Sequence, residues 1–191
     1  MKNLTQKMIR EALVKRLSEE PLSKITVRQL CQDCGINHNT FYYYYPDIYA
    51  VIEELFETSL QSVIQEYDET SSWEKSFLKA LEPCLENREA IEHIYHSISR
   101  EVLENYLYKT SGNIMERFVN SILPEVQAKE SDRKLIAHLY QWALTEALMH
   151  WIADGMKDDA VEMINRTGYL SDGTIEEALR RSAADNQKSD N

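Results

Sequence analysis

Residues 25–45 read ITVRQLCQDCGINHNTFYYYY, and the fold follows from this stretch. Thr26 can cap a first helix by accepting a hydrogen bond from an early backbone N–H, and Gly35 can end that helix. Asn37 can cap a second helix, which must stop near Tyr44 because the residue before the following proline is pushed out of helical geometry. Two short helices joined by a Gly-containing turn have the layout of a helix-turn-helix.

The second helix of this pair carries more polar and aromatic side chains than a core helix would need. It offers donors, acceptors and aromatic edges at Asn37, His38, Asn39, Thr40, Tyr42, Tyr43 and Tyr44. We expect Ile36, Phe41 and Tyr45 to anchor it, with Tyr45 buried and Tyr42 exposed. Amides can pair bidentately with adenine and hydroxyls can bind phosphate oxygens, so the helix is suited to a major groove.

The charge distribution favours the same end of the chain. The whole sequence of 191 residues has a net charge of −11, which by itself would discourage binding to nucleic acid. Residues 1–50, however, hold seven basic and five acidic side chains, whereas residues 51–191 hold 14 basic and 27 acidic ones. The N-terminal quarter is therefore the surface that we expect to face a polyanion, while the remainder repels phosphate.

The composition predicts an all-α fold. Five Gly and four Pro against 43% hydrophobic residues leave too few turns for an all-β protein. Apolar residues at helical spacing predict a first helix that Thr5 opens and Pro21 bounds. Further helices are predicted at 47–67, 72–86, 88–98, 99–123, 131–154, 158–167 and 173–184. We expect a helix-turn-helix DNA-binding domain at 1–46, a helical regulatory and dimerisation domain at 47–184, and a disordered tail at 185–191.

The sequence also predicts where the protein works. No apolar run approaches the roughly 18 residues of a membrane span, and the first residues lack the apolar core of a signal peptide. Three cysteines, an odd number, favour reduced thiols, so we expect a soluble, cytoplasmic protein with no membrane partner. Cys31 and Cys34 have CxxC spacing but fall on the apolar face of their helix, which favours small buried hydrophobes over a zinc or redox pair.

Residues 25–30 and 35–45 resemble the DNA-binding domain of TetR/AcrR-family transcriptional regulators. Residues 46–49, after the Tyr-rich turn, and residues 151–156 are similar to the subgroup that contains regulators of dihydroxyacetone kinase operons. The resemblance implies a homodimeric regulator of transcription that binds double-stranded DNA. We expect a repressor that reads a near-palindromic operator and is released by a small-molecule effector. No GxSxG, Walker-type or Rossmann glycine pattern is present, so we expect neither an enzyme nor a cofactor.

The resemblance assigns base-reading and phosphate-binding roles at the start of each helix. Thr26 would bind a phosphate through its hydroxyl and backbone N–H, and Arg28 would reach a phosphate or a base edge. Asn37, His38 and Asn39 occupy the base-reading start of the recognition helix. Asn39 is a departure, because the family often has Gly at this position.

The rest of the recognition helix matches positions that follow the DNA backbone. Thr40 and Tyr42 match the family's phosphate-binding Thr and Tyr, while Tyr43 and Tyr44 would lie along the backbone or against a thymine methyl. Ile48 stands where the family usually has a phosphate-binding Lys. Because this removes about one counterion-releasing contact, we expect lower affinity and a smaller salt dependence than is usual for the family.

The predicted helix at 131–154 is apolar on more than one face, with Trp142 on another side, so it needs two partners. One is the core of its own chain, and the other is the same helix of a second chain across a two-fold axis. A monomer with this helix fully internal is the alternative. Candidate residues for lining an effector pocket are Tyr95, His96, Tyr106, Phe118, His138, Trp142 and His150.

Two other functions stay open at this point. The net charge and Ile48 in place of a cation suit a helical interaction protein that no longer binds DNA. His93 and His96 can place two metal ligands on one helical face, which would suit a metal-dependent helical enzyme. Neither histidine, however, has the Glu three residues before it that di-iron bundles use.

Overall fold

The computed structural model describes residues 2–66, 72–97, 99–122, 124 and 126–189. Within these residues all regular structure is helical, which confirms the predicted fold class. Of the helices described there, none combines the length and the apolar character that crossing a membrane requires. The elements are α1 (Lys2–Leu17), the short 3-10 helix η1 (Leu22–Lys24), α2 (Val27–Cys34), α3 (His38–Tyr44), α4 (Ile48–Gln65), α5 (Trp73–Glu86), α6 (Arg88–Tyr95), α7 (Arg100–Ser121), α8 (Glu130–Ala153), α9 (Ala160–Ser171) and α10 (Thr174–Ser189).

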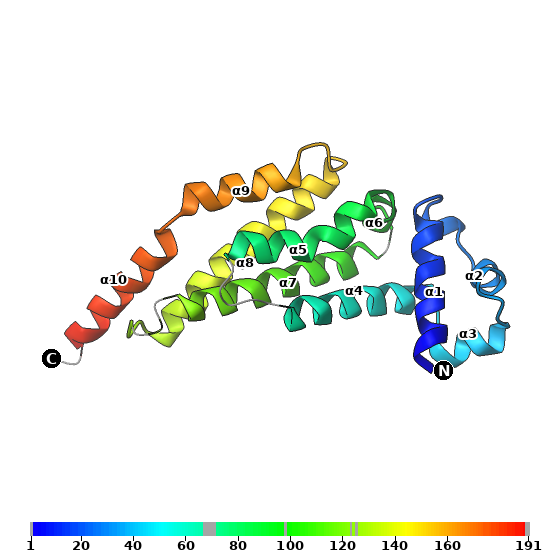
Figure 1. Ribbon diagram of the computed structural model, residues 1–191, viewed down its shortest axis with the longest axis horizontal. Coiled ribbons are helices and arrows are strands. Elements are labelled where there is room, and N and C mark those ends of the chain that lie inside the picture. The colour runs from blue at the N-terminus through cyan, green and yellow to red at the C-terminus, as the bar shows by residue number, and fades with distance from the viewer. Residues whose placement is uncertain (1, 67–71, 98, 123, 125, 190–191) are drawn as a thin grey trace.

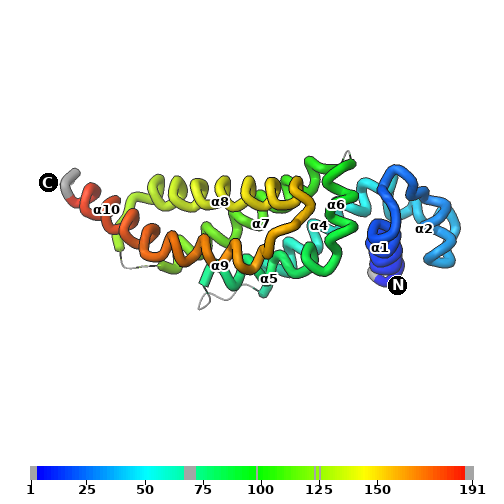
Figure 2. The backbone as a smooth tube through the Cα atoms, turned by 90° about the horizontal axis from the view of Figure 1, so that it is seen from above, coloured from blue at the N-terminus to red at the C-terminus, as the bar shows by residue number. Residues whose placement is uncertain are grey.

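The molecule is elongated, with the two termini at opposite ends of its long axis (Figures 1 and 2). Helices α1, α2 and α3 form a small unit at the N-terminal end. Helix α4 leads from this unit into the body, where it packs on α7 and α5. Helices α9 and α10 run back over the body, and α10 packs against α8. The helices predicted to bind DNA are therefore at one end of the molecule.

The start and end of α2 follow from local sequence. The Thr26 hydroxyl accepts a hydrogen bond from the Gln29 N–H at 3.3 Å, and the Gln29 side chain accepts one from the Thr26 N–H, which completes a capping box. Gly35 ends the helix in the left-handed conformation, at φ +63°. Residues other than glycine rarely adopt this backbone conformation, so the turn between α2 and α3 depends on Gly35.

The cap predicted for α3 is confirmed, and α4 begins with a cap of the same kind. Asn37 Oδ1 accepts from the Thr40 N–H at 2.8 Å, and Asp47 Oδ1 accepts from the Ala50 N–H at 2.9 Å. Tyr45 has an extended backbone and ends α3 directly before the proline. The connection from α3 to α4 is therefore three residues long.

Burial of the cysteines confirms their interpretation as small hydrophobic residues. Cys31, Cys34 and Cys84 are all buried, and burial raises the pKa of each thiol, that of Cys84 to about 12. The Cys34 thiol donates to the Met8 carbonyl oxygen at 3.4 Å, which ties α2 to α1. In the described part of the chain, no three His, Cys, Asp or Glu side chains gather in a way that could hold a metal ion.

Helices α7 and α8 form the centre of the body, and a glycine allows their close approach. The Gln141 side chain lies between them and donates to the Tyr108 carbonyl oxygen at 2.9 Å. A Cβ on Gly112 would lie 2.4 Å from Gln141 Nε2, so a larger residue there would displace the amide. Thr145 and Ser111 make a second hydrogen bond, at 3.3 Å, across the same helix pair.

Two helix ends differ from the sequence prediction. Helix α1 begins at Lys2, before the predicted start at Thr5, and α10 continues through residues 185–189, which the sequence assigns to a disordered tail. Contacts from the segment that precedes α8 hold this extension. Lys129 Nζ pairs with an Asp185 oxygen at 2.8 Å, and the Asn186 side chain donates to a backbone carbonyl at 3.2 Å. The polar composition of the tail gives no sign of these contacts.

The other predicted boundaries agree with the structure to within a few residues. Residues 67, 98, 123 and 190–191, which fall in predicted helices or in the predicted tail, lie outside the described residues.

Candidate nucleic-acid interface

Helix α3 presents one face to the core and another to solvent. Phe41 has no exposed surface and Tyr45 is 3% exposed, whereas Tyr42 and Tyr43 are 56% and 73% exposed. The burial predicted for Tyr45 and the exposure predicted for Tyr42 are both confirmed. Asn39, like His38, is also exposed. A helix this short thus offers an amide, an imidazole and two phenols to a partner.

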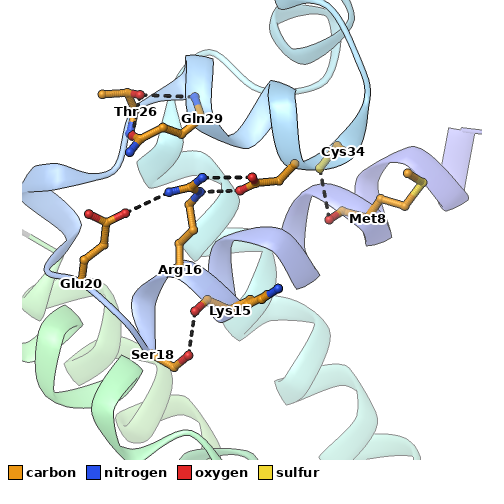
Figure 3. A network of polar contacts seen from close by, with 9 residues as sticks. Met8, Lys15, Arg16, Ser18, Glu20, Thr26, Gln29 and Cys34 are labelled. Carbon is orange, nitrogen blue, oxygen red and sulfur yellow. Dashed lines mark hydrogen bonds and ion pairs between the residues drawn. The ribbon is translucent and has the colours of Figure 1, made fainter.

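The orientation of α2 on α1 depends on a charged network (Figure 3). The Arg16 guanidinium forms two hydrogen bonds with the Asp33 carboxylate, one of them Nη2 to Oδ1 at 3.0 Å, and its Nη1 pairs with Glu20 at 3.0 Å. These bonds keep the pKa of Asp33 below its usual value and that of Arg16 above it. Arg16 lies on α1 and Asp33 on α2, so this pair joins the two helices.

The Arg16–Asp33 pair makes a prediction about pH. Because the native pKa of Asp33 is lowered, its stabilisation is present above the unfolded-state pKa of about 4 and is lost as pH falls through the native pKa. Asp33→Asn should therefore lower the free energy of unfolding by roughly 0.2–1 kcal/mol at pH 7, a small value because the pair is partly exposed. Urea unfolding at several pH values should show the two proteins converging as pH falls toward 3. A constant difference would contradict the prediction.

The structure places Thr26 at the surface but gives its donors to Gln29. The Thr26 N–H donates to Gln29 Oε1 at 2.7 Å, and the Thr26 hydroxyl donates to the same oxygen at 2.6 Å (Figure 3). The family resemblance assigns these two groups to a phosphate. A phosphate contact therefore requires the Gln29 side chain to move. The sequence signal of this competition is Gln at the third helical position, which is typical of a capping box.

The side-chain oxygen of Asn37 is likewise occupied within the protein. Its Oδ1 accepts from the Thr40 N–H at 2.8 Å and from the Thr40 hydroxyl at 3.1 Å. Contact with DNA would therefore use the amide N–H groups of Asn37 and a rotated hydroxyl on Thr40. Tyr44 is half-buried and packs edge-on against Tyr43, with ring centroids 4.9 Å apart. The exposed hydroxyl group of Tyr43 is therefore better placed to contact DNA than that of Tyr44.

Charge at this surface is modest. Arg28 and Lys24 are exposed beside the capping box, whereas Arg16 and Arg10 form ion pairs with carboxylates. Ile48 packs against the hydrophobic core at the start of α4, so its side chain stabilises the junction instead of meeting a phosphate. Weaker electrostatic attraction to DNA than is usual for the family stays a prediction.

The seven residues predicted to line an effector pocket do not share one cavity. Tyr106 is 4% exposed, stacks on Phe56 with centroids 4.7 Å apart, and lines an apolar cavity of about 80 Å³. His138 borders a separate groove of about 610 Å³ between α4, α7 and α8. The Trp142 ring stacks on that of His138, with centroids 5.9 Å apart. The other four lie elsewhere, at the end of α6 (Tyr95, His96), late on α7 (Phe118) and near the C-terminal end of α8 (His150).

The histidine pair on α6 also has a different setting from the one that a metal site needs. His93 Nδ1 lies 2.6 Å from the Leu17 carbonyl oxygen and donates to it, so this ring is tied to the end of α1. His96 is exposed and packs edge-on against Tyr95. The two side chains thus serve separate contacts.

Helix α8 has the second apolar face that the sequence predicts. Leu135, Leu139 and Trp142 are each between 51% and 53% exposed and lie opposite the face that packs on α7. We call these three residues the α8 outer face. The groove that His138 borders lies on one side of it. On the other side, Leu135 and Leu139 themselves line a groove of about 510 Å³ against α10.

Comparison with known proteins gives the family. A sequence model of the TetR family, described as "Transcriptional regulator C-terminal region", matches residues 71–173, which is more than half of the chain. Among solved structures, the chain is similar to "Dihydroxyacetone kinase operon activator DhaS", with a TM-score of 0.76 and 18% sequence identity, over 90% of this chain and 96% of that chain. At this identity the similarity concerns the fold. No curated protein sequence matches the chain.

The fold and the matched region together define an all-helical transcriptional regulator with an N-terminal helix-turn-helix. The chain belongs to the TetR family. The matched region lies outside residues 25–45, so it supports the family independently of the helix-turn-helix motif from which the resemblance was inferred.

Proposed function

We propose that this protein is a homodimer that binds a near-palindromic operator with α3 in the major groove and regulates transcription in the cytoplasm. The observation that carries the proposal is the exposed face of α3. Asn39, Tyr42 and Tyr43 point away from a buried Phe41 on a helix that contributes little else to the core. Two such helices, one from each copy, would enter successive major grooves about 34–36 Å apart.

The second copy is proposed to bind on the α8 outer face. Three large apolar side chains that are about half exposed, on the side of α8 opposite the core, form a patch of a kind that commonly marks an interface. A two-fold axis would bring the same patch of both copies together. The grooves on either side give the partner helix room to approach.

We further propose that an effector bound in the C-terminal body changes the spacing of the recognition helices. Such a ligand lowers DNA affinity only by its differential affinity for the two arrangements. Repression released by the effector is the expected sense of regulation. The similar solved structure is that of an operon activator, so activation is the competing outcome in a reporter assay.

Selection of bound duplexes from a random pool tests DNA recognition directly. We expect an inverted repeat to emerge. Asn39→Ala should then relax base preference at one position of each half-site by about 1–3 kcal/mol, whereas Tyr42→Phe should weaken all sequences alike, since a phosphate contact carries no base information. Asn165→Ala, an exposed asparagine on α9, is the matched control. Unchanged base preference in Asn39→Ala would remove the base-reading role assigned to this residue.

A protein-interaction module that no longer binds DNA is the second candidate. The occupied donors of Thr26, the packing of Ile48 against the core and the net charge of −11 favour it. It predicts duplex binding no stronger than that of an unrelated acidic protein at the same salt concentration. A mobility-shift titration with the unselected pool separates the two candidates.

A further inference from the structure

A single carboxylate on α4 joins the elements that surround the recognition helix. Glu54 Oε1 accepts from the Gln6 side-chain amide at 3.1 Å and pairs with Arg10 Nη1 at 3.2 Å, and both partners belong to α1. Its other oxygen, Oε2, accepts a hydrogen bond from the hydroxyl of Tyr45, the residue directly after α3. Glu54 therefore holds α1 and the C-terminal end of α3 on one turn of α4.

Burial makes these contacts stronger than those of a surface pair. The Arg10 side chain is 14% exposed and that of Glu54 is 32% exposed. Tyr45 is almost completely buried, and a buried hydroxyl is costly without a hydrogen-bond partner. Burial, with the hydrogen bond to Glu54 as the second cause, raises the pKa of Tyr45 to about 12. The hydroxyl thus remains protonated and donates to Glu54 over the whole physiological pH range.

Helix α3 needs such a directional contact. It has seven residues, and a helix of this length is not stable by itself. Phe41 attaches it through apolar packing, which has little directional preference. The Tyr45–Glu54 hydrogen bond has a defined direction, and Arg10 and Gln6 fix the carboxylate that accepts it. With a connection of three residues to α4, this bond sets the angle at which α3 leaves the body.

We propose that Glu54 is a positioning residue for DNA binding, which holds α3 at the angle that the major groove requires. The inference rests on the proposed function for its consequence at DNA, but the hold itself can be measured without DNA. Glu54 touches no base or phosphate in this scheme and acts through Tyr45. Sequence periodicity places it on a half-exposed side of α4, where nothing marks it as important.

Hydrogen–deuterium exchange of the full-length protein tests the hold on α3. Glu54→Gln keeps the shape of the side chain and removes its charge, and Tyr45→Phe removes the hydroxyl alone. Both should speed exchange of the amides in residues 38–44 about tenfold, while the amides at the centre of α7 and α8 keep their wild-type rates. A general loss of stability would instead speed exchange in both regions. Wild-type rates at 38–44 in both variants would overturn the proposal.

Affinity for the duplex selected by the wild-type protein supplies the second measurement. Removal of a carboxylate near DNA should strengthen binding by simple electrostatics, whereas loss of positioning should weaken it. Glu53→Gln, the same charge change at the exposed neighbouring residue, measures the electrostatic part. We expect Glu54→Gln and Tyr45→Phe each to bind about tenfold more weakly than wild type. The double variant should lose less affinity than the two single losses multiplied together, because both changes weaken the same Tyr45–Glu54 hydrogen bond.

The two proposals fail in different ways. If the wild-type protein selects no duplex, the proposed function is wrong, and the exchange measurement alone decides whether Glu54 holds α3. If the wild-type protein binds DNA and Glu54→Gln binds as tightly as Glu53→Gln, DNA recognition stands and the positioning role of Glu54 is wrong.

Discussion

Leu139→Glu should convert the proposed dimer to a monomer and weaken operator binding at least a hundredfold. Leu139 is 52% exposed and lies in the middle of the α8 outer face. At a two-fold interface each substitution occurs twice, so two carboxylates would meet near the axis after losing their water. The monomer itself should fold normally, since an exposed substitution of this kind changes stability by less than about 0.5 kcal/mol.

The large effect on DNA binding comes from effective concentration. In a dimer, binding of one recognition helix delivers the second to its half-site, which strengthens binding by roughly 10²–10⁴ without any new contact. Sedimentation or light scattering reports the mass, and a titration with the selected duplex reports the affinity. Tyr169→Glu, at an exposed aromatic residue on α9, serves as the control and should leave both unchanged. A Leu139→Glu protein that stays dimeric would place the interface elsewhere.

Phe41→Ala should be the most damaging change in the N-terminal unit. Its ring has no exposed surface and packs against Tyr42 and Tyr45, with centroid distances of 5.6 and 5.9 Å. Truncation of a buried Phe typically costs about 3–5 kcal/mol, through lost transfer free energy and the cavity left behind. Helix α3 has no other fully buried side chain, so it should detach and DNA binding should be lost.

Urea unfolding and circular dichroism measure this effect. The expected result is a first transition at low urea for the N-terminal unit, while the body unfolds near the wild-type midpoint. Tyr43→Ala is the matched control, because Tyr43 is 73% exposed and its loss should change stability by less than about 0.5 kcal/mol. A single transition at the wild-type midpoint in Phe41→Ala would mean that α3 is held by other contacts.

Much of the N-terminal unit could be predicted because its signals are local. Thr26, Asn37 and Asp47 cap helices through bonds to residues three positions ahead, and Gly35 ends α2 through its own backbone conformation. The extended backbone of Tyr45 follows from the next residue. None of these features depends on what another part of the chain does, so each could be inferred from a few neighbouring residues.

The predicted effector pocket shows the opposite case. The side chains were chosen for their chemistry, but whether they share a cavity depends on the angles between α6, α7 and α8. Of the seven, Tyr106 reaches the small internal cavity, while His138 faces a groove on another side of the body. Residue type alone carries no information about which of two helix faces meets a neighbour.

The sequence by itself determined the fold class, the helix-turn-helix, the buried state of Cys31 and Cys34 and the presence of two apolar faces on α8. Tertiary structure alone decided that Gln29 takes the donors of Thr26, that Asp33 binds Arg16, and that Glu54 joins α1 to the end of α3. The reason is physical. Caps and helical periodicity arise within one or two turns of chain, whereas these polar contacts exist only after separate helices have packed at particular angles.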